Sequence, residues 1–213
     1  MSEKTQEICP LCNDQGDPFY KDEFFLCNTC QGIFRSKKYH LSPSLEKSRY
    51  EKHHNDANDK GYQQFVSPIT NAVINECSAD DIGLDFGSGT GSAVFKILRD
   101  NNYKIREYDP FFHNHPELLE ERYDYIICCE VIEHFHDPKR EFCLLKRILK
   151  PKGTLYCMTD IFNQNISFAS WYYKDDETHV FIYQKETLEW IKNHFEFDDM
   201  ILDNRLIRLI NRL

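Results

Sequence analysis

The chain reads Leu84-Asp85-Phe86-Gly87-Ser88-Gly89-Thr90-Gly91 at its most informative point, with glycines alternating after an acidic residue. The apolar run 82–86 predicts a β-strand, and the amphipathic run 92–98 after the glycines predicts an α-helix. Glycine accepts positive φ and lets a ligand approach bare backbone, here beside the N-terminus of that helix. The stretch therefore predicts a ligand-binding turn between a strand and a helix. The alternative is a tight glycine turn that binds nothing.

Strands and helices alternate from residue 81 onward. The predicted strands are 82–86, 104–108, 123–129 and 153–159, with a C-terminal hairpin formed by 197–202 and 205–210. The predicted helices are 61–76, 92–101, 139–149 and 185–194. This alternation predicts the α/β class, with a doubly wound, mostly parallel sheet. Ligands of such sheets bind at the carboxyl ends of the strands.

An acidic residue follows the second predicted strand. Asp109 comes 18 residues after Gly91, in the run Glu107-Tyr108-Asp109-Pro110. A carboxylate at this place is suited to accept hydrogen bonds from both hydroxyls of a ribose. Glu107 is the alternative if the strand register differs, and Asp before Pro is also common in turns that bind nothing.

These motifs resemble the class I S-adenosylmethionine-dependent methyltransferases, of the type 11 and type 23 kind, with a Rossmann-like fold. The glycine turn is similar to their motif I, and 129–138, which contains E-x-x-E-H, is similar to a run in their small-molecule enzymes, including those of quinone biosynthesis. Segments 150–155 and 178–188 resemble later parts of the family, so that the resemblance covers about 60–213. It implies a cofactor site formed by Asp85, Gly87, Ser88, Gly89, Gly91, Asp109, Cys129 and Glu130.

The chain departs from the family between its second and third strands. Only 14 residues separate Asp109 from Asp124, where the family fits a helix, a strand and a loop with an acid that contacts adenine. We expect this strand to be missing or reduced to a stub around 115–119. Groups near Phe111, Phe112 or Cys129 are then the expected contacts for adenine.

We expect His134, His179 and Glu130 to be catalytic, with His136 as a further candidate base, because imidazole titrates near working pH. Glu130, Glu133 and His134 stand at i, i+3 and i+4, so that one helical turn would bring them to a common face. With His179 they resemble the set that holds Mg²⁺ or Mn²⁺ in small-RNA 2′-O-methyltransferases. The alternative is that Glu130 contacts cofactor or substrate, whereas Glu133 and His134 cap the turn.

The N-terminal residues 1–36 contain two C-x-x-C units. Cys9 and Cys12 are separated by 14 residues from Cys27 and Cys30. Four thiolates at this spacing predict a zinc ribbon with a structural Zn²⁺. Disulfides or a redox C-x-x-C pair are the alternatives.

The rest of the chain divides into two parts. We expect residues 37–60 to form a polar linker or an exposed helix that serves as a lid. We expect residues 61–213 to form the S-adenosylmethionine-binding domain.

Composition limits the classes of function. The 213 residues carry a formal charge of −9, which makes nucleic acid an unexpected partner. We find no long apolar run, and unpaired cysteines indicate a reducing compartment, so we expect a cytoplasmic protein outside membranes. A small-molecule acceptor is the first functional hypothesis. The alternatives are an RNA-directed methyltransferase whose ribbon grips the substrate, and a non-catalytic scaffold that binds S-adenosylmethionine and zinc. The oligomeric state is left open.

Overall fold

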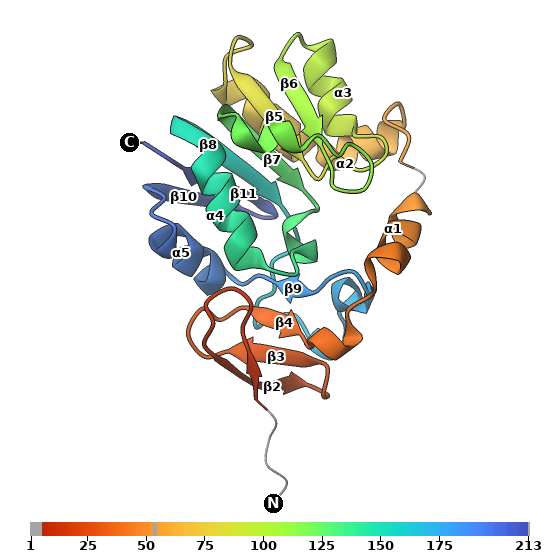
Figure 1. Cartoon of the computed structure of the whole chain (residues 1–213), viewed down its shortest axis with the longest axis vertical. Helices are drawn as coiled ribbons and strands as arrows, with labels where there is room; N and C mark the ends of the chain where they lie inside the picture. Colours follow the sequence, from red (N-terminus) through yellow and green to blue (C-terminus); the bar gives the residue numbers. More distant parts are fainter. Residues whose placement is uncertain (1–5, 53–54, 213) are drawn as a thin grey trace, which may run out of the picture.

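The larger of two β-sheets carries the predicted α/β fold. The computed structural model describes residues 6–52 and 55–212. The strand order is β10-β11-β8-β7-β5-β6 (Figure 1). The strands are β5 (Ile82–Phe86), β6 (Lys104–Tyr108), β7 (Tyr123–Cys129), β8 (Leu149–Met158), β10 (Asp199–Asp203) and β11 (Leu206–Ile210). Strands β6, β5, β7 and β8 are parallel, whereas β11 is antiparallel to both β8 and β10. The sheet is therefore mostly parallel, which confirms the predicted class.

Helices cover both faces of this sheet because its central strands are apolar on both sides. In β7, Tyr125 and Ile127 belong to one core cluster, and Ile126 and Cys128 belong to the other. Residues of α2 (Lys60–Glu76) and α3 (Ala93–Asp100) pack in the first cluster, and those of α4 (Pro138–Ile148) and α5 (Lys185–His194) in the second. Alternating side chains of buried strands thus separate the two helical layers.

The predicted bounds of β5, β6 and β7 are confirmed, but β8 begins four residues earlier than expected. Tyr123 pairs with Leu149, and the register between β7 and β8 shifts before Tyr125 pairs with Thr154. Lys152 has a φ of +68° in this region. The Pro-Lys-Gly sequence therefore forms an irregularity inside the strand, rather than a turn that precedes it.

The third strand of the family's sheet is absent from the described residues between β6 and β7. A 3-10 helix, η2 (Pro116–Glu120), lies there instead. Of the two expectations, a missing strand or a stub around 115–119, the structure therefore shows the first. The Leu118 carbonyl of η2 accepts a 2.8 Å hydrogen bond from the Tyr123 hydroxyl. Strand β6 is consequently the edge of the sheet.

A second sheet contains the paired cysteines and has the order β1-β2-β3-β4-β9. Its strands are β1 (Glu7–Ile8), β2 (Gln15–Tyr20), β3 (Phe24–Cys27), β4 (Ile33–Arg35) and β9 (Phe181–Ile182). The first four come from the N-terminus, whereas β9 comes from far along the chain. We call β1 to β4 with their connecting turns the cysteine unit. The proposed division at residues 36 and 60 stays a prediction.

Short helices connect the two sheets. After η1 (Lys37–Tyr39), helix α1 (Pro43–Glu51) runs from the cysteine unit toward α2 (Figure 1). His53 and His54, which we placed in the same lid segment, lie outside the described residues. Three further 3-10 helices are η3 (Ile132–His134), η4 (Phe168–Ser170) and η5 (Tyr172–Asp175).

Candidate active site

The turn between β5 and α3 contains two glycines with positive φ, +81° at Gly87 and +64° at Gly89. A Cβ at Gly87 would lie 2.7 Å from the Val131 side chain, whereas a Cβ at Gly89 would meet no atom within 4 Å. Both residues line a cavity, but Gly91 does not. A Cβ at Gly91 would lie 2.6 Å from the Asn55 carbonyl oxygen. Gly89 is thus the position that leaves bare backbone for a ligand, and Gly91 makes room for the chain after α1.

Asp85 lies below this turn. Its carboxylate is 2% exposed and accepts a 2.5 Å hydrogen bond from Ser92 Oγ. Ser92 Oγ in turn accepts from the backbone N–H of Phe95 at 3.0 Å, which caps helix α3. Burial raises the pKa of Asp85 to about 7, although the Ser92 hydrogen bond opposes this. Asp85 does not line the cavity, so the structure gives it a place in shaping the turn.

Asp109 follows β6 and reaches the cavity. Its Oδ2 accepts a 3.0 Å hydrogen bond from the backbone N–H of Gly89. Its Oδ1 accepts from the backbone N–H groups of Phe111 and Phe112 at 2.8 and 3.1 Å. These bonds hold the carboxylate at the glycine turn. Glu107 does not line the cavity, so that of the two acids only Asp109 reaches it.

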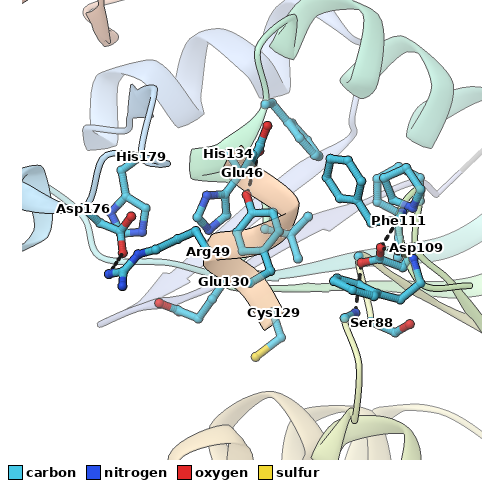
Figure 2. A pocket seen from close by; sticks show the side chains of 18 of the residues that line it. Glu46, Arg49, Ser88, Asp109, Phe111, Cys129, Glu130, His134, Asp176 and His179 are labelled. Atoms are coloured by element: carbon cyan, nitrogen blue, oxygen red, sulfur yellow. Dashed lines mark hydrogen bonds and ion pairs between the residues drawn. The ribbon is translucent and has the colours of Figure 1, made fainter. Parts of the chain in front are cut away.

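The cavity has a volume of about 1020 Å³ and extends from the glycine turn to helix α1. Figure 2 shows Ser88, Asp109 and Phe111 at one side, which we call the Asp109 end. It shows His134 and His179 at the other side, which we call the histidine end. The two ends belong to one continuous space, with the carboxyl end of β7 between them.

Cys129 and Glu130 form the middle of the cavity wall. Glu130 follows β7 with a φ of +54°, and its Oε2 lies 2.6 Å from Arg205 Nη2. Its Oε1 is buried without a hydrogen-bond partner. Burial raises the pKa of Glu130 to about 8, Glu133 adds to the effect and Arg205 opposes it. Burial likewise raises the pKa of the Cys129 thiol. Glu130 thus presents one oxygen atom that is available to a ligand.

The two imidazoles of the histidine end are oriented by backbone carbonyls. His134 Nδ1 lies 2.9 Å from the Thr178 carbonyl oxygen, and His179 Nδ1 lies 2.7 Å from that of Tyr173. A carbonyl only accepts, so each Nδ1 carries a proton, and in a neutral ring the basic nitrogen is then Nε2. Burial lowers the pKa of His179, His134 adds to this and Glu133 opposes it. His179 is therefore held in its neutral form.

Glu133 joins the two histidines, but Glu130 does not. Ligand atoms of Glu133, His134 and His179 lie within 4.8 Å of one another. Glu133 is fully buried, with one oxygen atom 2.6 Å from the Tyr173 hydroxyl and the other without a hydrogen-bond partner. The expected single helical turn is wrong, because η3 begins at Ile132 and the Glu130 carboxylate turns toward Arg205.

Helix α1 borders the histidine end through polar contacts. Arg49 Nη2 lies 3.1 Å from Asp176 Oδ2. Within α1, the Tyr50 hydroxyl donates to Glu46 Oε1 at 2.7 Å. Glu46 Oε2 lies 3.2 Å from His136 Nε2, and Glu46 is the buried residue of this helix. His136, a candidate base, is thus engaged with α1.

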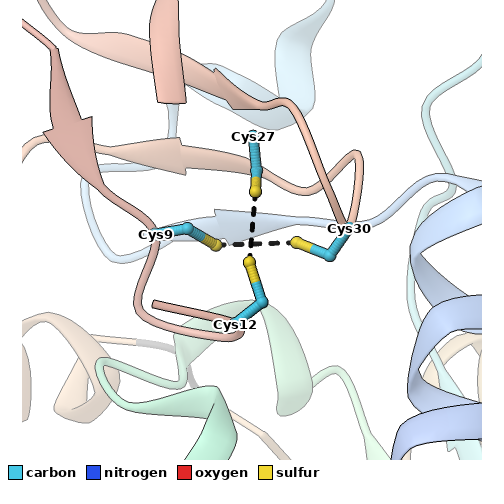
Figure 3. Close-up of side chains that lie close together, drawn as sticks. All are labelled: Cys9, Cys12, Cys27 and Cys30. Atoms are coloured by element: carbon cyan, nitrogen blue, oxygen red, sulfur yellow. Dashed lines mark hydrogen bonds between the residues drawn. The ribbon is translucent and has the colours of Figure 1, made fainter. Parts of the chain in front are cut away.

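The four cysteines of the N-terminal unit converge on one point (Figure 3). Their sulfur atoms lie within 4.8 Å of one another, with 3.5 Å between Cys9 and Cys30 and 3.2 Å between Cys12 and Cys27. Tetrahedral Zn²⁺ with bonds of about 2.3 Å requires sulfur atoms about 3.8 Å apart. The donor set therefore fits Zn²⁺.

Residues 57–200, more than half of the chain, match the methyltransferase domain family. The chain belongs to this family. The matched range contains the glycine turn, Asp109 and both histidines, whereas the cysteine unit precedes it. Among curated proteins, none matches the sequence.

Solved structures share the fold of this methyltransferase domain. An O-methyltransferase family protein from Burkholderia thailandensis has a TM-score of 0.54 and 12% identity, over 78% of this chain and 61% of that protein. Human N-acetylserotonin methyltransferase, solved with S-adenosylmethionine, has a TM-score of 0.54 and 12% identity, over 71% and 54%. An S-adenosylmethionine-dependent methyltransferase from Archaeoglobus fulgidus has a TM-score of 0.51 and 19% identity, over 65% and 71%. The chain thus spans less than two thirds of the first two proteins.

Sequence reasoning missed several residues of this site. Arg205 and Glu46 reach the cavity from a turn and a helix that carry no motif. Tyr172 and Tyr173 line the cavity near His179, whereas Trp171 does not line it and stacks on Tyr173 in the core cluster that they share. No helix among the described residues is both long and apolar enough to cross a membrane.

Proposed function

We propose that this methyltransferase transfers a methyl group from S-adenosylmethionine to a small-molecule acceptor. The observation that carries the proposal is the continuous cavity between the Asp109 end and the histidine end. Asp109 would hold the ribose hydroxyls, and the bare backbone at Ser88 and Gly89 would hold the methionine part. Asp85 and Gly91 support this turn from behind. Cys129 and Glu130 complete the cofactor wall, and the histidine end is left for the acceptor.

The charge of the cavity supports a small acceptor without phosphate groups. Its wall contains seven carboxylic acids and three arginines. Arg49 is paired with Asp176, and Arg205 is paired with Glu130. Such a wall repels a phosphate backbone and accepts neutral or cationic molecules. An RNA substrate is therefore the less favoured alternative.

The chain's own residues would position the acceptor and remove its proton. S-adenosylmethionine supplies a methyl group that is already activated by its sulfonium centre. A lone pair of the acceptor forms the new bond to the methyl carbon, and the carbon–sulfur bond breaks with its electrons staying on sulfur. If the acceptor is a hydroxyl or an amine, the proton that it loses on methylation goes to Nε2 of His179 or His134. Helix α1 excludes water and aligns the reactants.

Two measurements test this function. Calorimetry with S-adenosylmethionine and with S-adenosylhomocysteine is expected to give saturable heat. A metabolite extract incubated with a methyl-labelled donor is expected to yield a labelled small molecule, identified by mass. His179→Ala should then lose most of the transfer, whereas His115→Ala, an exposed histidine, should not. No heat from either ligand with folded protein would refute the proposal. Tight binding without any turnover would favour a scaffold, and salt-sensitive RNA binding would favour the RNA enzyme.

We also propose, as an alternative to the histidine base, a divalent ion at the histidine end, because an imidazole nitrogen that binds a metal cannot also accept a proton. The buried, unpartnered oxygen of Glu133 supports it, together with the ligand atoms of Glu133, His134 and His179, which all lie within 4.8 Å of one another. Histidines that donate Nδ1–H to carbonyls are typical of metal ligands. Mn²⁺ or Mg²⁺ would then lower the pKa of an acceptor hydroxyl. Electron paramagnetic resonance of added Mn²⁺ tests this, and equal spectra for the native protein and Glu133→Gln would exclude it.

We propose a structural Zn²⁺ for Cys9, Cys12, Cys27 and Cys30. Their convergence and the burial of three of them support tight thiolate coordination. Metal analysis of the purified protein is expected to find one zinc ion per chain. A chain that is folded and free of zinc would exclude this assignment.

A further inference from the structure

The segment that carries His179 is bound to the cysteine unit rather than to the large sheet. It leaves the large sheet after β8 and forms β9, which pairs antiparallel with β4. The pairs are Ile33 with Ile182 and Phe34 with Phe181. The β-sheet hydrogen bonds of this segment are therefore formed with the cysteine unit.

Arg35, at the end of β4, extends this attachment. Its backbone N–H donates to the Val180 carbonyl at 2.8 Å. Its guanidinium donates from Nη1 to the Asp176 carbonyl and from Nη2 to the Lys174 carbonyl, both at 2.9 Å. The side chain is buried, and its Nε lies 2.9 Å from the Glu23 carboxylate. One residue of the cysteine unit thus holds three carbonyls of the segment that carries His179.

The same segment orients both imidazoles. The Tyr173 carbonyl accepts from His179, and the Thr178 carbonyl accepts from His134. The Val180 N–H donates to the Glu133 carbonyl at 3.0 Å, which joins the segment to η3. A shift of this backbone would therefore turn both rings, although Arg35 itself does not line the cavity.

The cysteine cluster lies directly against β9. A Cβ at Gly32, two residues after Cys30, would lie 2.3 Å from the Phe181 ring. The Gln184 side chain donates to the Gln31 carbonyl at 2.6 Å. Cys27, Cys30 and Phe181 belong to one buried core cluster. A metal ion that fixes the 27–30 turn would thereby fix the surface on which β9 rests.

We propose that Arg35 is a positioning residue and that the metal-loaded cysteine unit braces the histidine end of the cavity from outside. This rests on the proposed function, since it concerns the acceptor side of the same site. The unit then sets the orientation and tautomer of His134 and His179 without contacting either substrate. Its task is to shape the site rather than to grip a substrate.

The first test uses Arg35→Lys and Arg35→Met in protein with ¹⁵N-labelled histidine. Lysine keeps a charge beside Glu23 but cannot bridge two carbonyls as the guanidinium does. Long-range ¹H–¹⁵N spectra report the tautomer of each ring. In both variants, the resonances of His134 and His179 are expected to lose the Nδ1–H signature, while exposed His115 keeps its spectrum. Arg106→Met, an exposed arginine on β6, is the matched control and should leave all rings unchanged.

A second readout separates this proposal from the proposed function. Binding of S-adenosylhomocysteine should stay within about twofold in the Arg35 variants, because the bonds that Arg35 makes to Glu23, Lys174, Asp176 and Val180 do not involve the glycine turn or Asp109. Removal of zinc with a chelator should produce the same histidine changes as Arg35→Lys. Variants that bind this ligand and keep both histidine signatures would overturn the brace. A native protein that binds no S-adenosylhomocysteine would instead overturn the proposed function.

If Arg35→Met does not fold, hydrogen exchange on Arg35→Lys decides the question. The amide of Val180 is expected to exchange at least tenfold faster than in the native protein, whereas amides of β5 stay unchanged. Unchanged protection of Val180 would overturn the proposal. RNA binding by the native protein that is lost in the variants, with both rings unchanged, would overturn the brace and mean that the cysteine unit contacts substrate.

Discussion

Replacing Gly89 by alanine separates a ligand-binding turn from a turn that only reverses the chain. Gly89 has a φ of +64°, and a new Cβ would meet no protein atom within 4 Å. The free energy of unfolding of the variant should therefore fall only by the cost of an alanine in the left-handed conformation, about 1–2 kcal/mol. Each 1 kcal/mol lowers Tm by about 2–4 °C in a chain of this size. Without ligand, the effect should stay this small.

The ligand is expected to make the difference visible. S-adenosylhomocysteine at about 100 times its Kd should stabilise the native protein by about 2.7 kcal/mol. A methyl group forced into the contact with the ligand costs about 1–3 kcal/mol. A hundredfold loss of affinity would reduce the stabilisation at the same concentration to about 0.4 kcal/mol. The ligand-induced shift of Tm should therefore be clearly smaller in Gly89→Ala than in the native protein, and nearly vanish if the loss of affinity is hundredfold.

Asn102→Ala provides the control, because Asn102 has a φ of +65° at the exposed end of α3, away from the cavity. It carries a similar backbone cost and should keep the full ligand-induced shift. Thermal unfolding with and without ligand, followed by circular dichroism, measures both variants. Equal ligand-induced shifts for the two variants would refute the assignment of Gly89 to the cofactor site.

Three further changes have defined outcomes. Asp109→Asn leaves one of three backbone N–H donors without an acceptor, so urea unfolding should show a loss of about 1–3 kcal/mol, and calorimetry should show weaker S-adenosylhomocysteine binding. Undiminished affinity would remove Asp109 from the site. Asp85 has its pKa raised to about 7 by burial, so the folded chain keeps a proton that the unfolded chain loses from about pH 4 upward. The free energy of unfolding should fall as pH rises from about 4 to about 7 and level off above that, and Asp85→Asn should flatten this dependence over the same window; an identical slope in both proteins contradicts the burial argument. Cys30→Ser should lose zinc in metal analysis and cost several kcal/mol of unfolding free energy; a variant that loses zinc at unchanged stability would contradict a structural role for the metal.

Much of the fold was predictable from local patterns. The strands β5 and β7 have the predicted bounds because each is a mostly apolar, buried run that a glycine or an acid follows. The edge strand β6 instead alternates buried and exposed residues. The two C-x-x-C units could also be recognised from the sequence, because each is a local turn in which the spacing of the cysteines is fixed. The start of β8 was misjudged because Pro-Lys-Gly is typical of a turn, whereas pairing with β7 accommodates it as an irregularity.

The site was less predictable, because its residues come from distant parts of the chain. Spacing alone suggested that Glu130 joins Glu133 and His134. The structure directs Glu130 to Arg205, 75 residues away, and nothing near either residue in sequence marks this ion pair. For the same reason, the sequence did not indicate that Glu46, on α1, lines the cavity.

The sequence by itself determined the alternating strands and helices, the glycine turn with its following acid, and the four-cysteine cluster. Each depends on residues within about one turn or one strand of their neighbours. Only the tertiary structure decided that β9 joins the cysteine unit, and that Arg35 holds the segment carrying His179. Contacts between Arg35 and Asp176 span 141 positions, and such pairs arise from how whole elements pack. No local pattern encodes which distant backbone a buried arginine will meet.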